Sequence, residues 1–252
     1  MLPTKKRETV LGLDGLIIYL YGPPKIGKTT FAANLETKKN KVLFLDCEGG
    51  TLRIEPECLD LQIAEWMQFD DALRELHKDK THGFGVIVVD SLTELREQLI
   101  RHVCNIKRAK NPSDPKFGGR AGWGLVSQTW KNALNLLMAG PWCCVFLDHA
   151  TQVETDMAGN KLSGPDRHNG PKKMTYFPTL SESARFVIAK RSDLMIRAYK
   201  NENGDRVATC TDLDGMGGQR GNVLPDSFPL DGKIFLNYFR EAYKKRKESS
   251  SA

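Results

Sequence analysis

The chain has 252 residues, of which 40% are hydrophobic and 27% are charged, and its formal net charge is +6. This composition suits one large globular domain, or a core with small appendages. No apolar stretch reaches the roughly 18–20 residues needed to cross a bilayer, and the basic start of the chain lacks the apolar segment of a secretory signal. We therefore expect no membrane partner, while the modest positive charge permits nucleic acid without requiring it.

The cysteines show neither C-x-x-C pairs nor zinc-ligand spacing with the histidines. Two of them, Cys143 and Cys144, lie inside an apolar run, which is typical of buried thiols. This usage predicts a reduced, cytoplasmic protein.

Residues 22–29 read Gly-Pro-Pro-Lys-Ile-Gly-Lys-Thr, which fits the P-loop pattern G-x-x-x-x-G-K-[ST]. An apolar run at 16–21 precedes the loop and a plausible helix at 29–35 follows it. This order favours a phosphate site over the alternative, a chance glycine turn before an ordinary helix.

Backbone N–H groups of such a loop form an anion hole, so we expect a nucleoside triphosphate to contact Gly22, Pro23, Pro24, Lys25, Ile26, Gly27, Lys28, Thr29 and Thr30. Lys28 is expected to reach the β- and γ-phosphates and Thr29 to hold Mg²⁺, while Lys25 could face phosphate, a neighbouring subunit or solvent.

The remaining elements follow from apolar runs and breakers in chain order. We expect strands at 41–46, 61–64, 84–90 and 142–148, and a late hairpin formed by 194–199 and 206–211. We expect helices at 69–78, 92–109, 122–139, 180–191 and 232–247, loops at 111–120 and 151–178, and a disordered tail at 249–251. Unbroken apolar strands that alternate with helices predict an α/β fold with a mostly parallel sheet and a late antiparallel hairpin.

Two acids stand at strand ends, where ligands of open α/β sheets bind. Asp90 ends the best apolar strand and is the predicted Walker B ligand of Mg²⁺, with a helix N-cap as the alternative role. Glu48 follows another strand end by two residues and is the predicted base for the attacking water, with a solvated loop acid as the alternative. Glu94 is the rival base. His149, which ends the next strand, could contact the γ-phosphate or simply be a satisfied strand-end histidine.

Together these motifs resemble the ATPase core of RecA-family proteins. The resemblance rests on the P-loop, Leu-Asp-Cys-Glu at 45–48, Val-Val-Asp-Ser at 88–91 and Phe-Leu-Asp-His at 146–149. It implies that Glu48 activates water and that His149 occupies the place of a polar sensor, usually Gln. Asp-Cys-Glu-Gly-Gly at 46–50 and Gly-Trp-Gly at 122–124 look most like short, core-only RecA-like ATPases of bacteriophages, which are associated with single-strand annealing and recombination.

This resemblance implies a RecA-like core over residues 15–236, after an N-terminal extension at 1–14 and before a basic helix end and tail at 237–252. It also implies ATP and Mg²⁺ as ligands, a homo-oligomer that is a ring or filament, and a location in the bacterial host cytoplasm if the chain is phage-encoded. In such assemblies a neighbouring subunit supplies a basic residue to the site. Arg220 is the candidate for this residue, and Arg197 and Lys200 are weaker candidates. The alternative is that Arg220 is an ordinary solvated arginine of a loop.

In this family, loops after the Walker B and sensor strands bind single-stranded DNA. The matching segments here are 110–121 and 151–178, where basic, aromatic and glycine residues suit backbone tracking and base stacking. The predicted DNA contacts are Lys116, Phe117, Arg120, Lys161, Arg167, Lys172, Lys173 and Phe177; ordinary polar loops are the alternative.

Two functions stay open on the sequence. The first is an ATPase that acts on single-stranded DNA in phage-type recombination or annealing, with a single-strand-binding protein as a candidate partner. The second is a nucleotide-dependent assembly or regulatory switch with a protein partner and no DNA. A small-molecule kinase is disfavoured because no lid with paired arginines is evident.

Overall fold

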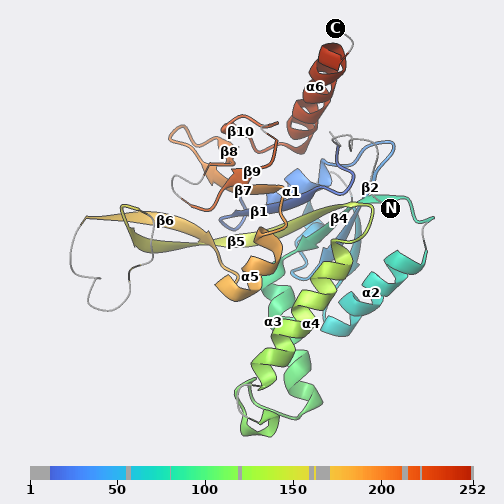
Figure 1. Ribbon diagram of the computed structural model, residues 1–252, viewed down its shortest axis with the longest axis vertical. Helices are drawn as coiled ribbons and strands as arrows, with labels where there is room; N and C mark the ends of the chain where they lie inside the picture. The colour runs from blue at the N-terminus through green and yellow to red at the C-terminus, as the bar shows by residue number, and fades with distance from the viewer. Residues whose placement is uncertain are drawn as a thin grey trace, which may run out of the picture.

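The computed structural model describes residues 12–54, 58–79, 81–118, 121–158, 162, 171–211, 215–221 and 223–250. Figure 1 shows a central twisted sheet with helices on both faces, from which a β-hairpin, a pair of helices and the C-terminal helix project. Within the described ranges, no helix combines the length and apolar character needed to cross a membrane.

The sheet is mostly parallel, and its strand order is β10-β8-β7-β1-β5-β4-β2-β3. Its parallel strands are β1 (Ile17–Gly22), β2 (Lys41–Asp46), β3 (Leu59–Gln62), β4 (Phe84–Asp90), β5 (Cys143–Asp156) and β7 (Leu194–Lys200). Antiparallel strands follow late in the chain: β8 (Arg206–Thr209), β9 (Gly218–Gln219) and β10 (Ser227–Pro229). This arrangement confirms the predicted α/β fold with a mostly parallel sheet and late antiparallel strands.

The strand that precedes the P-loop lies near the middle of the sheet. All six residues of β1 are buried, because helices cover both of its faces. β5 and β7 flank β1, and β5 separates it from β4. The carboxyl ends of β1, β2 and β4 therefore meet at one edge, together with His149, where β5 leaves the central sheet. The residues predicted to contact the nucleotide and Mg²⁺ stand at this edge.

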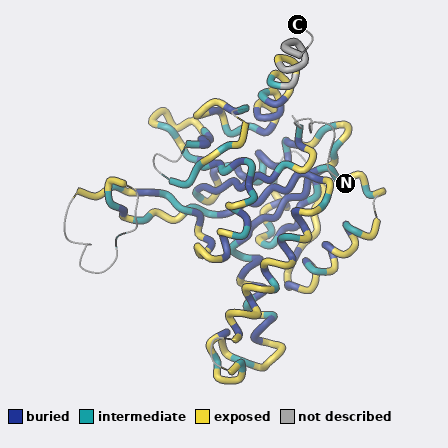
Figure 2. The backbone as a smooth tube through the Cα atoms, in the orientation of Figure 1, coloured by how far each residue is buried: buried dark blue, intermediate teal, exposed yellow. Residues whose placement is uncertain are grey.

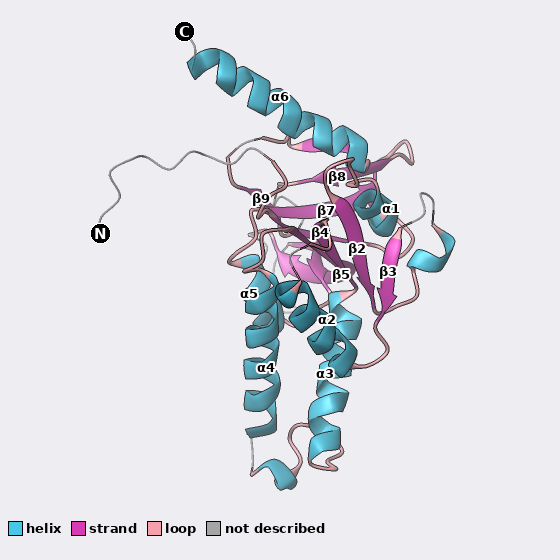
Figure 3. Cartoon of the chain, turned by 90° about the vertical axis from the view of Figure 1, so that its right-hand side faces the viewer, coloured by secondary structure: helices cyan, strands magenta, loops and turns pink. Residues whose placement is uncertain are grey.

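The helices bury the two faces of the sheet in separate cores (Figure 3). One face is covered by α2 (Trp66–Lys78), α3 (Leu92–Ile106), α4 (Ala121–Leu137) and α5 (Glu182–Ala189). The other is covered by α1 (Lys28–Ala33) and α6 (Gly232–Ser250). Short 3₁₀ turns occur at η1 (Thr51–Arg53) and η2 (Pro115–Phe117). The buried strands and exposed projections are evident in Figure 2.

Local sequence explains α2 well. Trp66, Phe69, Leu73 and Leu76 recur at helical spacing and form its buried stripe. The Gln68 side chain accepts hydrogen bonds from the backbone N–H groups of residues 64 (2.7 Å) and 65 (3.1 Å), which satisfies donors left open at the helix start.

The predicted loop at 151–178 is wrong at both of its ends. β5 continues to Asp156, and β6 (Lys172–Pro178) returns antiparallel to it, so that the two strands project as a hairpin. Thr155 and Thr175 are buried between the strands, and their hydroxyl oxygens lie 2.7 Å apart. Pairs of this kind stabilise an antiparallel ladder without apolar residues. Residues 159–161 and 163–170 fall outside the described ranges.

The other predicted helices and strands are confirmed with shifted ends, as is usual for such boundaries. The predicted loop at 111–120 contains the turn η2, and residues 119–120 fall outside the described ranges. The predicted disordered tail is wrong for Ser249 and Ser250, because α6 extends to Ser250.

Candidate nucleotide site

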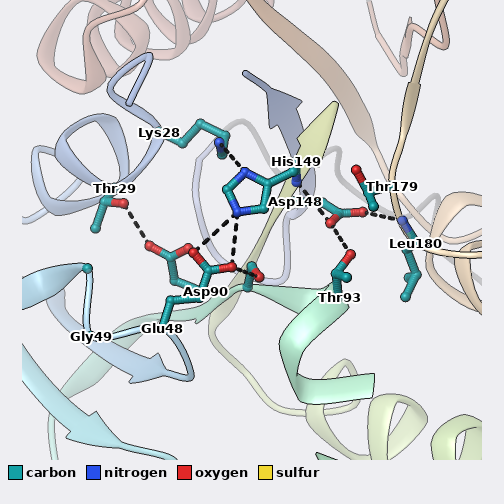
Figure 4. A network of polar contacts seen from close by, with 12 residues as sticks. Lys28, Thr29, Glu48, Gly49, Asp90, Thr93, Asp148, His149, Thr179 and Leu180 are labelled. Atoms are coloured by element: carbon teal, nitrogen blue, oxygen red, sulfur yellow. Dashed lines mark hydrogen bonds and ion pairs between the residues drawn. The ribbon is translucent and has the colours of Figure 1, made fainter. Parts of the chain in front are cut away.

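A cavity of about 530 Å³ opens at the carboxyl edge of β1, β2, β4 and β5. It brings together most of the residues predicted to bind or hydrolyse the nucleotide. Its lining consists of Pro24, Lys25, Gly27, Lys28, Thr29, Thr30, Glu48, Gly50, Ile54, Asp90, His149 and Arg206. Figure 4 shows the polar contacts at its centre.

Lys28 is buried at the start of α1 and is held by its own loop. Its Nζ donates to the carbonyl oxygens of Gly22 (3.0 Å) and Pro23 (3.1 Å) and lies 3.5 Å from His149 Nδ1. Burial lowers the pKa of the Lys28 ammonium, while the nearby Asp90 and Glu48 oppose that change. An ammonium has three N–H donors; carbonyl oxygens engage two of them and His149 Nδ1 faces the third, so a phosphate oxygen would take the place of one of these partners.

Thr29 and Asp90 form the predicted metal pair. Thr29 Oγ1 donates to Asp90 Oδ2 at 2.7 Å, across the start of α1 and the end of β4. Burial raises the pKa of the Asp90 carboxyl to about 6, although the Thr29 hydrogen bond opposes this shift. Mg²⁺ prefers oxygen ligands and is commonly held by one or two carboxylates together with substrate phosphates. A hydroxyl and a buried carboxylate at the mouth of a P-loop therefore fit that ion.

The turn that carries Glu48 is fixed by Asp46, the last residue of β2. Asp46 accepts hydrogen bonds from the N–H groups of Glu48 (2.9 Å), Gly49 (2.8 Å) and Thr51 (3.0 Å), and from the Thr51 hydroxyl (2.6 Å). Burial acts to raise the Asp46 pKa, but these hydrogen bonds outweigh it and leave the pKa lowered. Gly49 has φ +74°, a conformation that glycine adopts without strain. The turn thus directs Glu48 into the cavity.

Glu48 is paired on two sides. Its Oε1 accepts a hydrogen bond from the Ser91 hydroxyl and lies 3.0 Å from His149 Nε2. The hydrogen bond from His149 lowers the Glu48 pKa, and the same contact raises the pKa of His149. Lys28 faces Nδ1 of the same imidazole, so His149 connects the P-loop lysine to the predicted base.

A second polar network lies directly behind His149. The carboxylate of Asp148 is fully buried and accepts hydrogen bonds from the Tyr19 hydroxyl (2.9 Å), the Thr93 hydroxyl (2.6 Å) and the Leu180 N–H (3.1 Å). In addition, the Thr179 N–H donates to the backbone oxygen of His149 at 2.9 Å. His149, where β5 leaves the central sheet, is therefore tied to α3 and to the segment that follows the hairpin.

A family model described as AAA domain matches residues 14–218. The chain belongs to this family. No curated protein matches the chain. Among solved structures, one that is similar is the crystal structure of the RadB recombinase, with 17% identity over 87% of this chain and 89% of that chain, and a TM-score of 0.46. The family, the P-loop and the fold make the chain a nucleotide-binding, ATPase-type P-loop protein.

Arg220 lies far from this AAA-domain protein's own nucleotide cavity. Its Nη1 is 3.2 Å from Asp193 Oδ1, and Asp193 Oδ2 accepts the N–H of Ile17, the first residue of β1. The P-loop follows the opposite end of that strand. Six residues at about 3.3 Å each separate the two edges, so Arg220 does not reach its own site, and its action on a neighbouring subunit stays a prediction.

The predicted DNA contacts are scattered. Lys116 and Phe117 lie in η2, which connects α3 to α4, and Lys116 Nζ donates to the Arg108 backbone oxygen. Lys172 and Phe177 lie on β6 of the hairpin; Lys172 pairs with Glu154 at 3.6 Å, and the Phe177 ring lies 5.9 Å from the Arg185 guanidinium carbon. Lys173 also lies on β6. Arg120, Lys161 and Arg167 fall outside the described residues.

Sequence reasoning missed Arg206 altogether. This residue begins β8 and lines the cavity. Its only sequence signal was its place in the predicted hairpin, because the contact with the P-loop depends on how β8 pairs with β7. The roles predicted for the other lining residues remain predictions.

Proposed function

We propose that this protein hydrolyses ATP in the cavity at the carboxyl edge of its sheet, and that it does so as a RecA-like ATPase acting on single-stranded DNA in phage-type recombination or annealing. The observation that carries the hydrolysis is the convergence of Lys28, Glu48, the Thr29–Asp90 pair and His149 on one cavity. A carboxylate beside a P-loop suits water as the nucleophile better than a phosphate acceptor.

In this proposal each side chain has one task. The loop N–H groups and Lys28 bind the phosphate chain. Thr29 and Asp90 hold Mg²⁺, which when bound neutralises charge that develops on the phosphates. Glu48 orients a water and accepts its proton; His149 and the Ser91 hydroxyl hold the carboxylate in place.

The charge state of Glu48 supports this assignment. Its lowered pKa keeps the carboxylate ionised at neutral pH, as a group that accepts a proton requires. His149 donates to that carboxylate, so in the structure the base is partly engaged. Release of Glu48 from His149 would increase its basicity, and a γ-phosphate near Lys28 would compete for the lysine that faces the same imidazole.

The DNA part of the proposal rests on the family resemblance and on one connection in the structure. The β5–β6 hairpin begins directly at His149 and ends directly before Thr179, whose N–H donates to His149. Binding to the hairpin would therefore act on the backbone of a residue in the nucleotide cavity. Lys172 and Lys173 give the returning strand its basic start.

Steady-state ATP hydrolysis with and without single-stranded DNA, at low and at moderate salt, tests this function. We expect stimulation that weakens as salt rises, because contacts with phosphates release counterions. Normal nucleotide binding without stimulation would refute the DNA part. It would favour the second candidate, a nucleotide-dependent switch with a protein partner. The pairing of Lys172 with Glu154 is consistent with that candidate, because it engages a lysine that was predicted to contact DNA.

A further inference from the structure

Arg206, the first residue of β8, lies against the P-loop although β8 is two strands away from β1 in the sheet. A Cβ atom built on Gly27 would lie 3.3 Å from Arg206 Nη1 and 3.8 Å from its Cδ, so the guanidinium packs directly on this glycine. Gly27 precedes Lys28, has φ +109° and lines the same cavity. Its lack of a side chain leaves the space that the arginine occupies.

The guanidinium has no protein partner in the described ranges, where neither an ion pair nor a hydrogen bond involves the Arg206 side chain. The two acids of the cavity are already engaged, Glu48 by His149 and Asp90 by Thr29. An arginine carries five N–H donors in a fixed fork that matches phosphate oxygens. The cavity thus holds an unpaired cation next to a loop built for an anion.

The backbone of Arg206 is firmly placed, although its side chain is exposed. Arg206 pairs with Lys200 of β7, and its carbonyl oxygen accepts the N–H of Leu230 at 3.0 Å. β8 is itself hydrogen-bonded to both β7 and β10. A residue anchored on two neighbouring strands presents its side chain from a rigid element, as a binding residue requires.

We propose that Arg206 binds the phosphate chain of the nucleotide in the same subunit, as a second cationic contact beside Lys28. This inference rests on the proposed nucleotide binding and goes beyond it, because the residue comes from β8, outside the P-loop. Arg206 acts in its own subunit, whereas Arg220 is predicted to act in the site of a neighbouring subunit. Nucleotide binding would thereby connect the P-loop to the late antiparallel strands.

Equilibrium binding of a fluorescent ADP analogue, with inorganic tripolyphosphate as a competitor, tests the assignment. The variants are R206A and R206K, and the matched control is R74A, an exposed arginine on α2 that pairs with Asp70. Thermal unfolding without nucleotide checks that each variant is folded. R206K provides the test if R206A does not fold.

We expect R206A to weaken both the ADP analogue and tripolyphosphate about tenfold, the size of one charge-assisted hydrogen bond at a partly exposed site. R206K should lose less because it keeps the charge but not the fork, and R74A should bind like the wild type. Unchanged affinity in R206A would overturn the inference. Weaker ADP binding with unchanged tripolyphosphate binding would also overturn it, since the contact would then be to the ribose or base.

The same titration separates this inference from the function on which it rests. A wild-type protein that binds the ADP analogue but releases no phosphate from ATP would refute the proposed hydrolysis and leave the Arg206 contact standing. A wild-type protein that binds neither ligand would overturn both.

Discussion

Replacement of Glu48 by Gln separates catalysis from folding in this protein. The Glu48 side chain is 32% exposed, and its partner His149 is 30% exposed. A pair of this exposure contributes at most about 1 kcal/mol to the free energy of unfolding. The glutamine amide keeps an oxygen that accepts from Ser91, so we expect the fold to persist.

The effect on hydrolysis should be much larger. A positioned general base contributes about 10²- to 10⁴-fold to a rate, which corresponds to roughly 3–5 kcal/mol in the activation free energy. E48Q should therefore lower kcat by at least about a hundredfold. Nucleotide affinity should be kept, because Glu48 is not among the residues assigned to the phosphates or Mg²⁺.

Phosphate release under single-turnover conditions, together with equilibrium ATP binding, measures both quantities. E94Q is the matched control, because Glu94 lies on α3 and its Oε1 is 2.8 Å from Arg101, so it is engaged away from the P-loop contacts. A rate in E48Q within a few-fold of the wild type would refute the assignment of the base. A large loss in E94Q would instead favour the rival acid.

Two further predictions concern pH and packing. Contact with Glu48 raises the pKa of His149, so the pair stabilises the fold below the ordinary histidine pKa and loses that contribution as pH rises through the pKa of the folded state. Urea unfolding should therefore show that H149Q lowers the free energy of unfolding more at pH 6 than at pH 9. A loss of stability in H149Q that does not shrink at pH 9 would contradict this. A Cβ at Gly22 would lie 2.6 Å from the backbone oxygen of Ala198, so G22A should destabilise the protein by about 1–3 kcal/mol and impair nucleotide binding. Unchanged urea midpoint and affinity in G22A would show that β1 and β7 separate more easily than the structure indicates.

The sequence was informative where function depends on a local pattern. The P-loop and Glu48 each follow an apolar strand, Asp90 ends one, and parallel strands bring their carboxyl ends to one edge. The convergence of these residues on one cavity follows from that rule.

The features that were missed depend on long-range pairing. Thr155 and Thr175 are buried in the hairpin, yet the polar run between them, with its glycines and prolines, predicts a loop. Arg206 reaches Gly27 only because β8 folds back along β7. Neither contact leaves a periodic signal in the chain, so the structure was needed to find them.

The most direct test of the account is release of inorganic phosphate from ATP in the presence of Mg²⁺ by the purified protein, compared with a K28A variant prepared in the same way. The account predicts steady hydrolysis by the wild type and none above background in K28A, because Lys28 is the buried cation of the P-loop and lines the cavity. Equal phosphate release by the two proteins, or none by a wild type that binds ATP, would contradict the claim that this cavity is an ATPase site.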